Sequence, residues 1–498
     1  MKWITCVAIA AVIALPSGAT AQGGNVTIDE YLERVRSTHP FFKAELLQPA
    51  IEQQGADSYL GRQDWRLLAD ARLAHLEPLP TGPFQPERVD VFALGAGTER
   101  LFWGSGSRLM VDWVSAVTDQ NLPGLTIPGP GGGLEIPIGP STFYRNVLRA
   151  TWSLPLLQNR GGELDRLEYE VSLYAVDASV ATSWENQEDF LLSAGTTFLI
   201  WALAEEQIGI AERRLDLAVE ELERSKRQRA AFLVDEVDVW RSEAAVHNTQ
   251  SALSLIETRW KSVQADLATI AGDSTYYARR PGYDLYTLPD PPDADLFVAG
   301  IVNTARLVRA LDYRRDQLAR LEQGYADTEH PSLDLNLSGA LQGGDDGWGG
   351  AFEMKYPDIG AGLVFTYPLG TRTATANVAQ TRLEIRQLEE RIRAVQISLT
   401  ASACSIIVQL VELRDVIDAN VLAISANEKR TEEELKLYEQ GRGDLAFVIQ
   451  ARDNIALSEL EYAGNVATYH NLLLRLEALS DELLPTPTAE DGVSDRDR

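Results

Sequence analysis

Residues 371–440 read TRTATANVAQTRLEIRQLEERIRAVQISLTASACSIIVQLVELRDVIDANVLAISANEKRTEEELKLYEQ, and this stretch decides the fold. It contains no glycine and no proline, the two residues least favourable inside a helix. A continuous helix of this length would extend roughly 100 Å, whereas an ordinary helix has about three turns. The sequence therefore predicts a helix too long for a globular domain.

The apolar residues of this stretch recur at helical spacing. They step by three and four residues through Ile385, Leu388, Ile392, Val395 and Leu399. An earlier part of the chain steps in the same way through Leu167, Val171, Tyr174, Ala178 and Ala181. Such seams are typical of coiled coils, so we expect both helices to pack along their length against other helices.

The long helix belongs to the second of two similar parts of the chain. A Pro-Leu step leads into each long helix, and the steps Leu154-Pro155-Leu156 and Tyr367-Pro368-Leu369 lie 213 positions apart. Each long helix is expected to be followed by a second helix that runs back along it, the return helix. Asp238-Val239 and Phe447-Val448, near the starts of the two return helices, lie 209 positions apart. We therefore expect an internal two-fold repeat, with one structural repeat over 22–272, a second over 295–484 and a linking segment over 273–294.

The segments before the long helices read as β-hairpins, at about 105–155 and about 333–367. Leu333, Leu335 and Leu337 alternate with Asp334 and Asn336, for example. Each hairpin should have one apolar and one polar face.

The residues ahead of the first hairpin read as helical. Ile28, Leu32 and Val35 fall on one face, and His39-Pro40 separates this helix from a second one that ends at about Leu76. The expected fold is mainly α with a pair of membrane β-hairpins, which makes four strands per chain.

The N-terminus has the order of a secretory signal. Lys2 precedes the apolar stretch from Ile4 to Leu15, and Ala19-Thr20-Ala21 follows. We expect residues 1–21 to be a signal peptide, and no transmembrane helix to remain after its removal. The polar residues 485–498 are expected to form a disordered tail.

The net charge and the missing motifs exclude several functions. A formal charge of −28 disfavours binding to nucleic acid through its phosphates. The five histidines stand far apart and form no metal-binding spacing. We find no nucleophile motif in the right context, so we expect no enzyme activity, no cofactor and no metal.

The two hairpins constrain the assembly. An open four-stranded sheet in hydrocarbon would leave unpaired backbone groups at its edges, so the chain must supply part of a shared barrel. Three copies would give twelve strands, within the range of outer-membrane barrels, and the helices would continue the barrel as an α-helical coiled-coil tube. The alternative is a structural or adhesive surface protein that uses its coiled coils without conducting.

The local sequence is similar to that of the TolC-like outer membrane efflux proteins, the outer membrane factors. Tyr438-Glu439-Gln440-Gly441-Arg442-Gly443, followed by Val448-Ile449-Gln450-Ala451, resembles the family's turn before a return helix. The resemblance implies a homotrimer in the outer membrane of a Gram-negative bacterium, extending into the periplasm. It also implies docking to a periplasmic adaptor and an inner-membrane pump, and passive export through a duct gated at its periplasmic tip. Whether the cargo is a drug, a metal or a polypeptide stays open.

The resemblance also implies which residues line the tip. Acidic residues narrow the lumen in this family, and Asp238 occupies one such position, whereas its counterpart in the second repeat is Phe447. Three interpretations of these residues remain: a ring of carboxylates, a hydrophobic constriction by Phe447, or simple packing of Phe447 between helices. The lumen or gate candidates are Asp235, Asp238, Asp444 and Phe447.

Charged residues flank both predicted helical turns. Basic residues lie before the first turn, and Glu432, Glu433 and Glu434 lie before the second. These tips could pair with each other, engage an adaptor or simply be solvated. The candidates for tip or adaptor contacts are Arg227, Arg229, Gly441, Arg442 and Gly443.

Aromatic residues of the hairpins are candidates for the membrane interface, where such side chains often form girdles. Ordinary strand packing is the alternative. The candidates are Trp113, Tyr144, Trp152, Phe365 and Tyr367.

Overall fold

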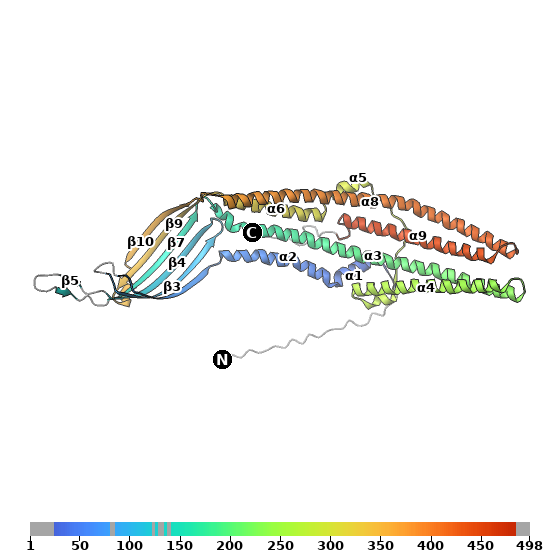
Figure 1. Cartoon of the computed structure of the whole chain (residues 1–498), viewed down its shortest axis with the longest axis horizontal. Coiled ribbons are helices and arrows are strands. Elements are labelled where there is room, and N and C mark those ends of the chain that lie inside the picture. Colours follow the sequence, from blue (N-terminus) through green and yellow to red (C-terminus); the bar gives the residue numbers. More distant parts are fainter. Residues whose placement is uncertain (1–23, 80–84, 122–124, 128–133, 137–140, 485–498) are drawn as a thin grey trace, which may run out of the picture. The chain divides into compact units, whose positions relative to one another are not determined.

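A computed structural model describes residues 24–79, 85–121, 125–127, 134–136 and 141–484 (Figure 1). The predicted signal peptide and the predicted tail lie outside the described residues. The chain divides into two compact units. The helical unit comprises Met1–Glu45, Trp184–Ala305 and Ser398–Arg498, and the sheet unit comprises Leu46–Ser183 and Arg306–Ile397.

The sheet unit is built on a six-stranded antiparallel sheet with the strand order β10-β9-β7-β4-β3-β2. Figure 1 shows the long strands lying side by side. Their bounds are β2 Arg66–Leu76, β3 Arg88–Phe102, β4 Ser107–Asn121, β7 Ser141–Pro155, β9 Ser332–Asp345 and β10 Tyr356–Thr366. Two short strands, β5 Leu125–Ile127 and β6 Leu134–Ile136, pair with each other between β4 and β7.

The prediction of two hairpins is confirmed by the strand pairs β4–β7 and β9–β10, but the prediction of four strands per chain is wrong. The predicted helix to about Leu76 ends instead with α2, Pro40–Ser58, and a 3-10 turn over Tyr59–Gln63. β2 follows, rich in Leu, Ala and Arg, which favour helices locally. Pairing with β3 along its whole length overrides that preference.

The register of the sheet separates an apolar face from a polar face. One row crosses all the long strands through Ala69, Ala96, Trp113, Leu148, Leu341 and Pro357. Asp112 and Arg149 pair in the adjacent row, on the opposite face, where Arg149 Nη2 lies 3.1 Å from Asp112 Oδ2. These two rows show the alternation that the sequence predicts for β4 and β7.

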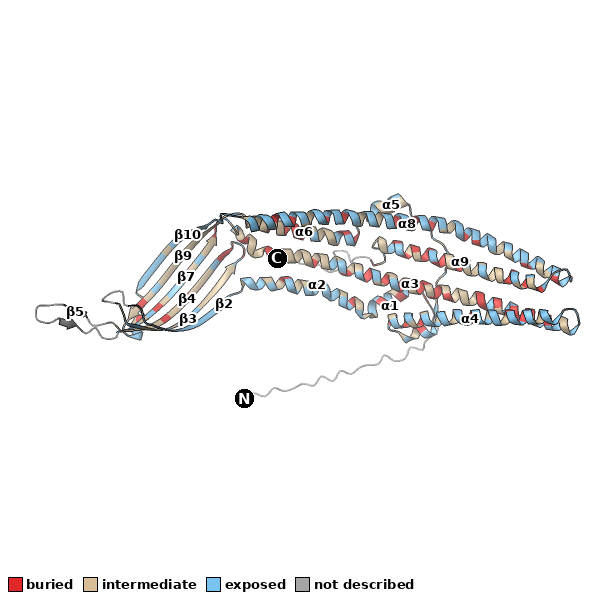
Figure 2. Ribbon diagram, in the orientation of Figure 1, coloured by how far each residue is buried: buried red, intermediate tan, exposed pale blue. Residues whose placement is uncertain are grey.

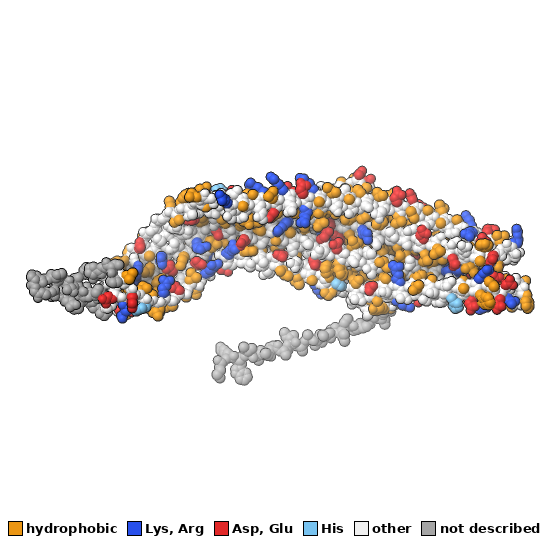
Figure 3. Space-filling model, in the orientation of Figure 1, with side chains coloured by type: hydrophobic (Ala, Val, Ile, Leu, Met, Phe, Trp, Pro, Cys, Tyr) orange, Lys and Arg blue, Asp and Glu red, His pale blue; other side chains and the backbone are white. Residues whose placement is uncertain are grey.

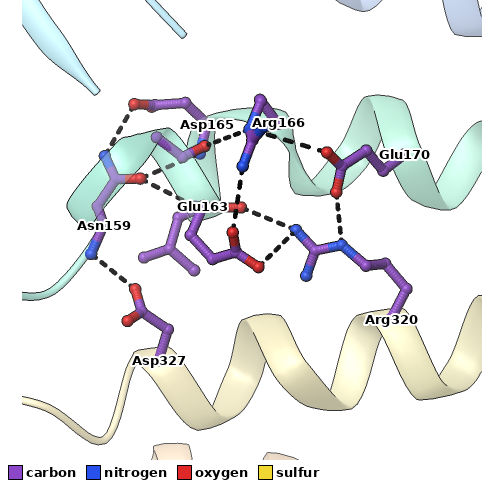
Figure 4. A network of polar contacts seen from close by, with 9 residues as sticks. Asn159, Glu163, Asp165, Arg166, Glu170, Arg320 and Asp327 are labelled. Carbon is purple, nitrogen blue, oxygen red and sulfur yellow. Dashed lines mark hydrogen bonds and ion pairs between the residues drawn. The ribbon is translucent and has the colours of Figure 1, made fainter. Parts of the chain in front are cut away.

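Asn159 forms the junction between β7 and the helix α3, Glu163–Ala230 (Figure 4). Its Oδ1 accepts hydrogen bonds from the backbone nitrogens of Leu164 (2.9 Å) and Asp165 (3.3 Å). Its own backbone nitrogen donates to Asp327 Oδ2 at 2.6 Å. Asn159 thus accepts hydrogen bonds from backbone N–H groups in the first turn of α3. It also connects this turn to the end of α6, Arg306–Asp327, through its own hydrogen bond to Asp327.

Arg320 of α6 fastens the same two helices together (Figure 4). Its Nε lies 2.5 Å from Glu170 Oε2 and its Nη2 lies 2.9 Å from Glu163 Oε1. The Arg320 side chain is only 10% exposed, so water screens these pairs less than it would at an open surface. The start of the long helix is therefore held by a network of ions within the sheet unit.

The helical unit confirms the predicted long helices. α8 spans Arg372–Glu439, close to the predicted limits, and α3 ends at Ala230. The return helices are α4, Glu236–Ala271, and α9, Leu445–Leu479. Gly272 caps α4 in the left-handed conformation, at the end predicted from the sequence.

The two larger buried clusters among the described residues of the helical unit lie away from the tip. The first packs α1, Ile28–Thr38, against α3 and α4 around Tyr31, Phe198 and Trp201. The second packs α8 against α9 around Leu410, Val466 and Tyr469. The segment between α4 and α6 supplies a 3-10 turn, Ser274–Ala278, the strand β8, Arg280–Pro281, which pairs with β1, Asn25–Val26, and the helix α5, Ala294–Ile301.

Apolar side chains remain exposed on α4 and α8. In the helical unit these include Trp240 and Leu255 of α4, and Val408 and Leu422 of α8. Figure 2 shows α8 mostly exposed, and Figure 3 shows hydrophobic side chains among charged ones at the surface. Among the described residues, α8 also contains a stretch long and apolar enough to cross a membrane by length and composition alone.

Candidate functional site

The tip of the helical unit, where both helical hairpins turn, contains every lumen and tip candidate named from the sequence. The first turn joins α3 to α4 and the second joins α8 to α9. Side chains of the two hairpins contact one another there. Tyr438 donates its hydroxyl hydrogen to Gln228 Oε1 at 2.7 Å, and Arg224 Nη1 lies 3.5 Å from Glu439 Oε1.

The second turn is closed by glycines. Gly441 has a φ of 71°, in the left-handed region, and Gly443 donates its backbone N–H to Leu437 O at 3.0 Å. A Cβ on Gly443 would lie 2.9 Å from the backbone nitrogen of Tyr438. Asp444 then caps α9 by accepting a hydrogen bond from the Ala446 backbone nitrogen at 2.8 Å. The predicted turn is present, and Asp444 caps the helix that follows it.

The first turn has a different construction. Phe232 adopts the left-handed conformation with a φ of 59°, and its side chain is 87% exposed. Leu233 is 74% exposed beside it. Asp235 stands at the N-cap position of α4 but makes no side-chain capping hydrogen bond.

Arg241 of α4 brings two of the predicted lumen acids together. Its Nη1 lies 3.2 Å from Asp238 Oδ1 and 3.2 Å from Asp444 Oδ1. The two carboxylates therefore share one guanidinium, which balances part of their charge. No sequence pattern indicates this contact, because Asp238 and Asp444 are more than two hundred positions apart.

Some of the charged residues beside the turns pair within their own helix. Lys436 lies 2.8 Å from Glu432 and 2.9 Å from Glu433, and these carboxylates raise the pKa of its ammonium group. Arg227 and Arg442 are exposed, and Arg229 is half-buried. Among the described residues these three arginines make no side-chain ion pair, so they are available to a partner.

Phe447 lies on the first turn of α9 and is 52% exposed. The neighbouring buried cluster consists of Tyr438, Leu445 and Val448, and Phe447 is not part of it. About half of Phe447 is therefore left exposed by the part of the chain that the structure describes.

A buried ion pair links α3 to α9 a few turns from the tip. Arg452 Nη1 lies 2.8 Å from Glu221 Oε1, and the side chains are 8% and 2% exposed. Burial raises the pKa of the Glu221 carboxyl, against the opposing effects of Arg452 and Arg214, and burial lowers the pKa of Arg452. Desolvation thus outweighs the attraction between the two charges.

Arg214 supports this pair from the same face of α3. Its side chain is 6% exposed, and its Nε donates to Asp453 Oδ1 of α9 at 2.7 Å. Nearby, Arg213 makes a more exposed pair with Glu459 at 3.2 Å. The contact between α3 and α9 is therefore ionic as well as apolar, which the coiled-coil pattern did not reveal.

Four of the five interfacial aromatics named from the sequence lie on the apolar face of the sheet. Trp113 and Tyr144 fall on this face, as do Trp152 and Phe365, and Tyr367 follows β10 with 51% exposure. Trp113 and Tyr144 contact Phe352 and Trp348, with ring centroids 6.2 Å and 5.6 Å apart. Trp348 begins the short helix α7, Trp348–Ala351, between β9 and β10.

One group of carboxylates in the described residues is close enough to suggest a cation. The oxygen atoms of Glu185, Glu188 and Asp481 lie within 4.8 Å of one another. Glu188 Oε1 already accepts a hydrogen bond from the Leu484 backbone nitrogen at 3.1 Å. Because acidic clusters are common without a metal, we assign none here.

Solved structures show the same fold along nearly the whole chain. The outer membrane protein VceC of Vibrio cholerae matches with a TM-score of 0.64 and 12% identity, covering 91% of this chain and 96% of that one. The CmeC outer membrane channel of Campylobacter jejuni matches at 0.62 and 11% identity, covering 91% and 86%. The open-state MtrE outer membrane channel of Neisseria gonorrhoeae matches at 0.61 and 15% identity, covering 92% and 89%.

No protein-family model and no curated protein matches the sequence. At these identities the structural likeness establishes the fold. The predicted resemblance is confirmed at that level: this chain has the fold of the TolC-like outer membrane channels.

Proposed function

We propose that the chain is one subunit of a trimeric exit duct in the outer membrane of a Gram-negative bacterium. The observation that carries the proposal is the sheet, whose one face is mainly apolar and whose other face carries charged residues such as the pair Asp112–Arg149. Such a sheet suits a barrel wall between lipid and water. The two long helical hairpins of the same chain would continue the duct into the periplasm as a coiled-coil tube.

The exposed apolar residues of α4 and α8 support the trimer. A single chain leaves Trp240, Leu255, Val408 and Leu422 in water, and neighbouring copies could cover them. The duct would be passive, with energy supplied by an inner-membrane pump that reaches it through a periplasmic adaptor. The two-fold repeat would let six helical hairpins from three copies form the tube wall.

We place the gate at the tip. Arg241 balances Asp238 and Asp444, which weakens the case for a purely acidic ring. Phe447 is half-exposed, so three phenyl rings could narrow the pore by excluding water. The contacts Tyr438–Gln228 and Arg224–Glu439 would hold the two hairpins together in the closed state.

Conductance of the purified protein in planar bilayers tests both the duct and its gate. We expect Phe447→Ala to raise single-channel conductance, because a smaller side chain widens the constriction. Leu457→Ala is the matched control, since Leu457 is 63% exposed on the same helix. A Phe447→Ala channel with wild-type conductance and antibiotic exclusion would remove Phe447 from the gate.

The proposed adaptor contact has its own test. Reversing Arg227 and Arg229 to Glu should abolish co-purification with the adaptor or open the pore, because both side chains lie at the first turn. Lys261→Glu is the control, since Lys261 is exposed on α4 and pairs only with Glu257 among the described residues. Unchanged adaptor binding and conductance would contradict the contact.

A non-conducting coiled-coil surface protein is the alternative. The charged face of the sheet argues against it, because a stalk needs no water-facing lumen. If the purified protein inserts into bilayers but conducts under no gating condition or variant, the alternative is favoured.

A further inference from the structure

The sheet ends in two free edges, β2 on one side and β10 on the other. We infer that β2 of one copy pairs with β10 of the next copy, so that each subunit contributes six strands to a closed wall. With the trimer of the proposed function, on which this inference rests, the barrel has eighteen strands rather than the twelve expected from four strands per chain.

The backbone supplies the first reason. Among the described residues, β2 pairs only with β3 and β10 pairs only with β9. Each edge strand is 11 residues long, which is enough to cross a bilayer when tilted. The outward N–H and C=O groups of both strands would be unsatisfied in hydrocarbon, where each costs several kcal/mol. The occupant of each edge must therefore be another strand.

The strand directions supply the second reason. Five successive antiparallel pairings separate β10 from β2, so these two strands run in opposite directions. A rotation about the barrel axis keeps every direction unchanged. The β2 strand of the next copy therefore meets β10 in antiparallel orientation, the arrangement that runs through the rest of the sheet.

The side chains supply the third reason. Leu67 of β2 and Ile359 of β10 belong to one row of the register and lie on the same apolar face, 85% and 87% exposed. A seam between copies would join these faces into one continuous lipid-facing wall. On the polar face β2 carries Arg72 and β10 carries Asp358, and among the described residues neither makes a side-chain ion pair. A seam between copies would therefore bring a base of one copy and an acid of the next copy to the same, lumen side of the wall.

The inference changes the expected width of the duct. Barrel diameter grows roughly linearly with strand number, so eighteen strands give a lumen about 1.5-fold wider than twelve. Barrels of this size leave an aqueous channel. The barrel would then impose no constriction of its own, and selection of cargo by size would occur elsewhere along the duct.

Disulfide cross-linking in outer membranes tests the seam. Cys404 is exposed and is first replaced by Ser. Cysteines are then placed in pairs on the apolar faces of the edge strands, one at Leu67 or Leu73 and one at Ile359 or Leu363, and the membranes are treated with copper phenanthroline. We expect at least one pair to give a ladder that ends at a covalent trimer on a non-reducing gel.

Val111→Cys provides the contrasting arm, because Val111 lies on the same face of β4 and is flanked by β3 and β7. Cross-links between Val111→Cys and the β10 cysteines, with none from β2, would overturn the inference and place the β2–β3 hairpin outside the wall. A ladder that ends at a dimer would overturn the count of eighteen.

Conductance separates this inference from the proposed function. If the β2–β10 ladder forms but the protein never conducts, the seam stands and the duct fails. If the protein conducts while β10 cross-links to β4, the duct stands and the seam fails.

Discussion

The two turns at the tip perform the same task with different chemistry. The α8–α9 turn is closed locally, by Gly441, Gly443 and the cap on Asp444. The α3–α4 turn holds Phe232 in a conformation that bulky residues avoid, and Asp235 makes no side-chain cap. The α8–α9 turn is stabilised by its own residues, whereas the α3–α4 turn has a strained backbone and exposes apolar side chains.

The difference indicates a division of labour between the hairpins. A turn that is stable by itself can hold its helices in register. A strained turn with exposed Phe232 and Leu233 offers apolar surface that a partner can bind. In the duct proposed above, the first turn is therefore the better candidate for engaging an adaptor. The following predictions test how far each hairpin depends on itself and on the other.

Breaking the buried pair that joins the hairpins should have the largest effect. Arg452→Met leaves Glu221 buried without its cation, which typically costs about 3–5 kcal/mol. Replacing both partners, with Glu221→Gln and Arg452→Met together, should restore most of the stability, because no buried charge remains. Thermal unfolding in detergent, followed by circular dichroism, measures both. A milder loss in the single variant than in the double would contradict the pairing.

The same variant has a pH signature. Burial already raises the pKa of Glu221, and removing Arg452 removes an interaction that lowers it. The folded Arg452→Met protein should hold a proton on Glu221 that the unfolded chain releases, so its stability should fall as pH rises through the interval between the unfolded and folded pKa values. The melting temperature should therefore recover on acidification. Arg213→Ala, at an exposed pair, should show no such recovery.

Gly443→Ala should destabilise the second turn by about 1–3 kcal/mol, because the new Cβ would press on the backbone of Tyr438 and Leu437. Gly464→Ala, inside α9 with nothing within 4 Å of the new Cβ, should be neutral or stabilising by up to about 1 kcal/mol. Urea unfolding of both variants gives the comparison. Equal losses would show that the tightness of the turn is not the cause.

Removing the two N-cap side chains should destabilise the two turns by different amounts. Asp444→Ala should cost about 1 kcal/mol through loss of the bond to Ala446. Asp235→Ala should cost less, because its side chain caps nothing. Hydrogen exchange in the first turns of α9 and α4 reports the two effects separately. If Asp235→Ala speeds exchange in α4 more than Asp444→Ala speeds exchange in α9, the assignment of the caps is wrong.

The smallest expected change has the opposite sign. Phe232→Gly should stabilise the isolated protein by less than about 1 kcal/mol, because glycine adopts the left-handed conformation without strain, although it also adds freedom to the unfolded chain. The same variant should weaken adaptor binding if the ring is a contact. Thermal unfolding and adaptor co-purification check the two parts. Loss of stability would mean that the phenyl ring packs within the protein.

The long helices could be predicted from sequence because their signal is local. The interval without Gly or Pro from Thr371 to Gln440 gave α8, Arg372–Glu439, almost to the residue. The turn at Gly441 and the cap at Asp444 were equally accessible, since glycine and aspartate have specific roles at helix ends.

The strand β2 and the ionic contacts could not be predicted in the same way. Arg66–Leu76 consists largely of helix-forming residues, and only its neighbour β3 makes it a strand. Arg241 and Arg452 each meet an acid more than two hundred positions away in the chain. A pattern with a period of a few residues carries no information about such pairs, so the site's acids were found without the cations that neutralise them.

The hairpin β2–β3 has a consequence for how such a barrel can evolve. β2 leaves the end of the sheet where η1 joins it, and β3 returns the chain to that same end before β4 begins. Inserting or deleting this hairpin changes the strand number by two and leaves both sheet edges antiparallel. In the barrel proposed above, the diameter of the pore would therefore change in discrete steps during evolution.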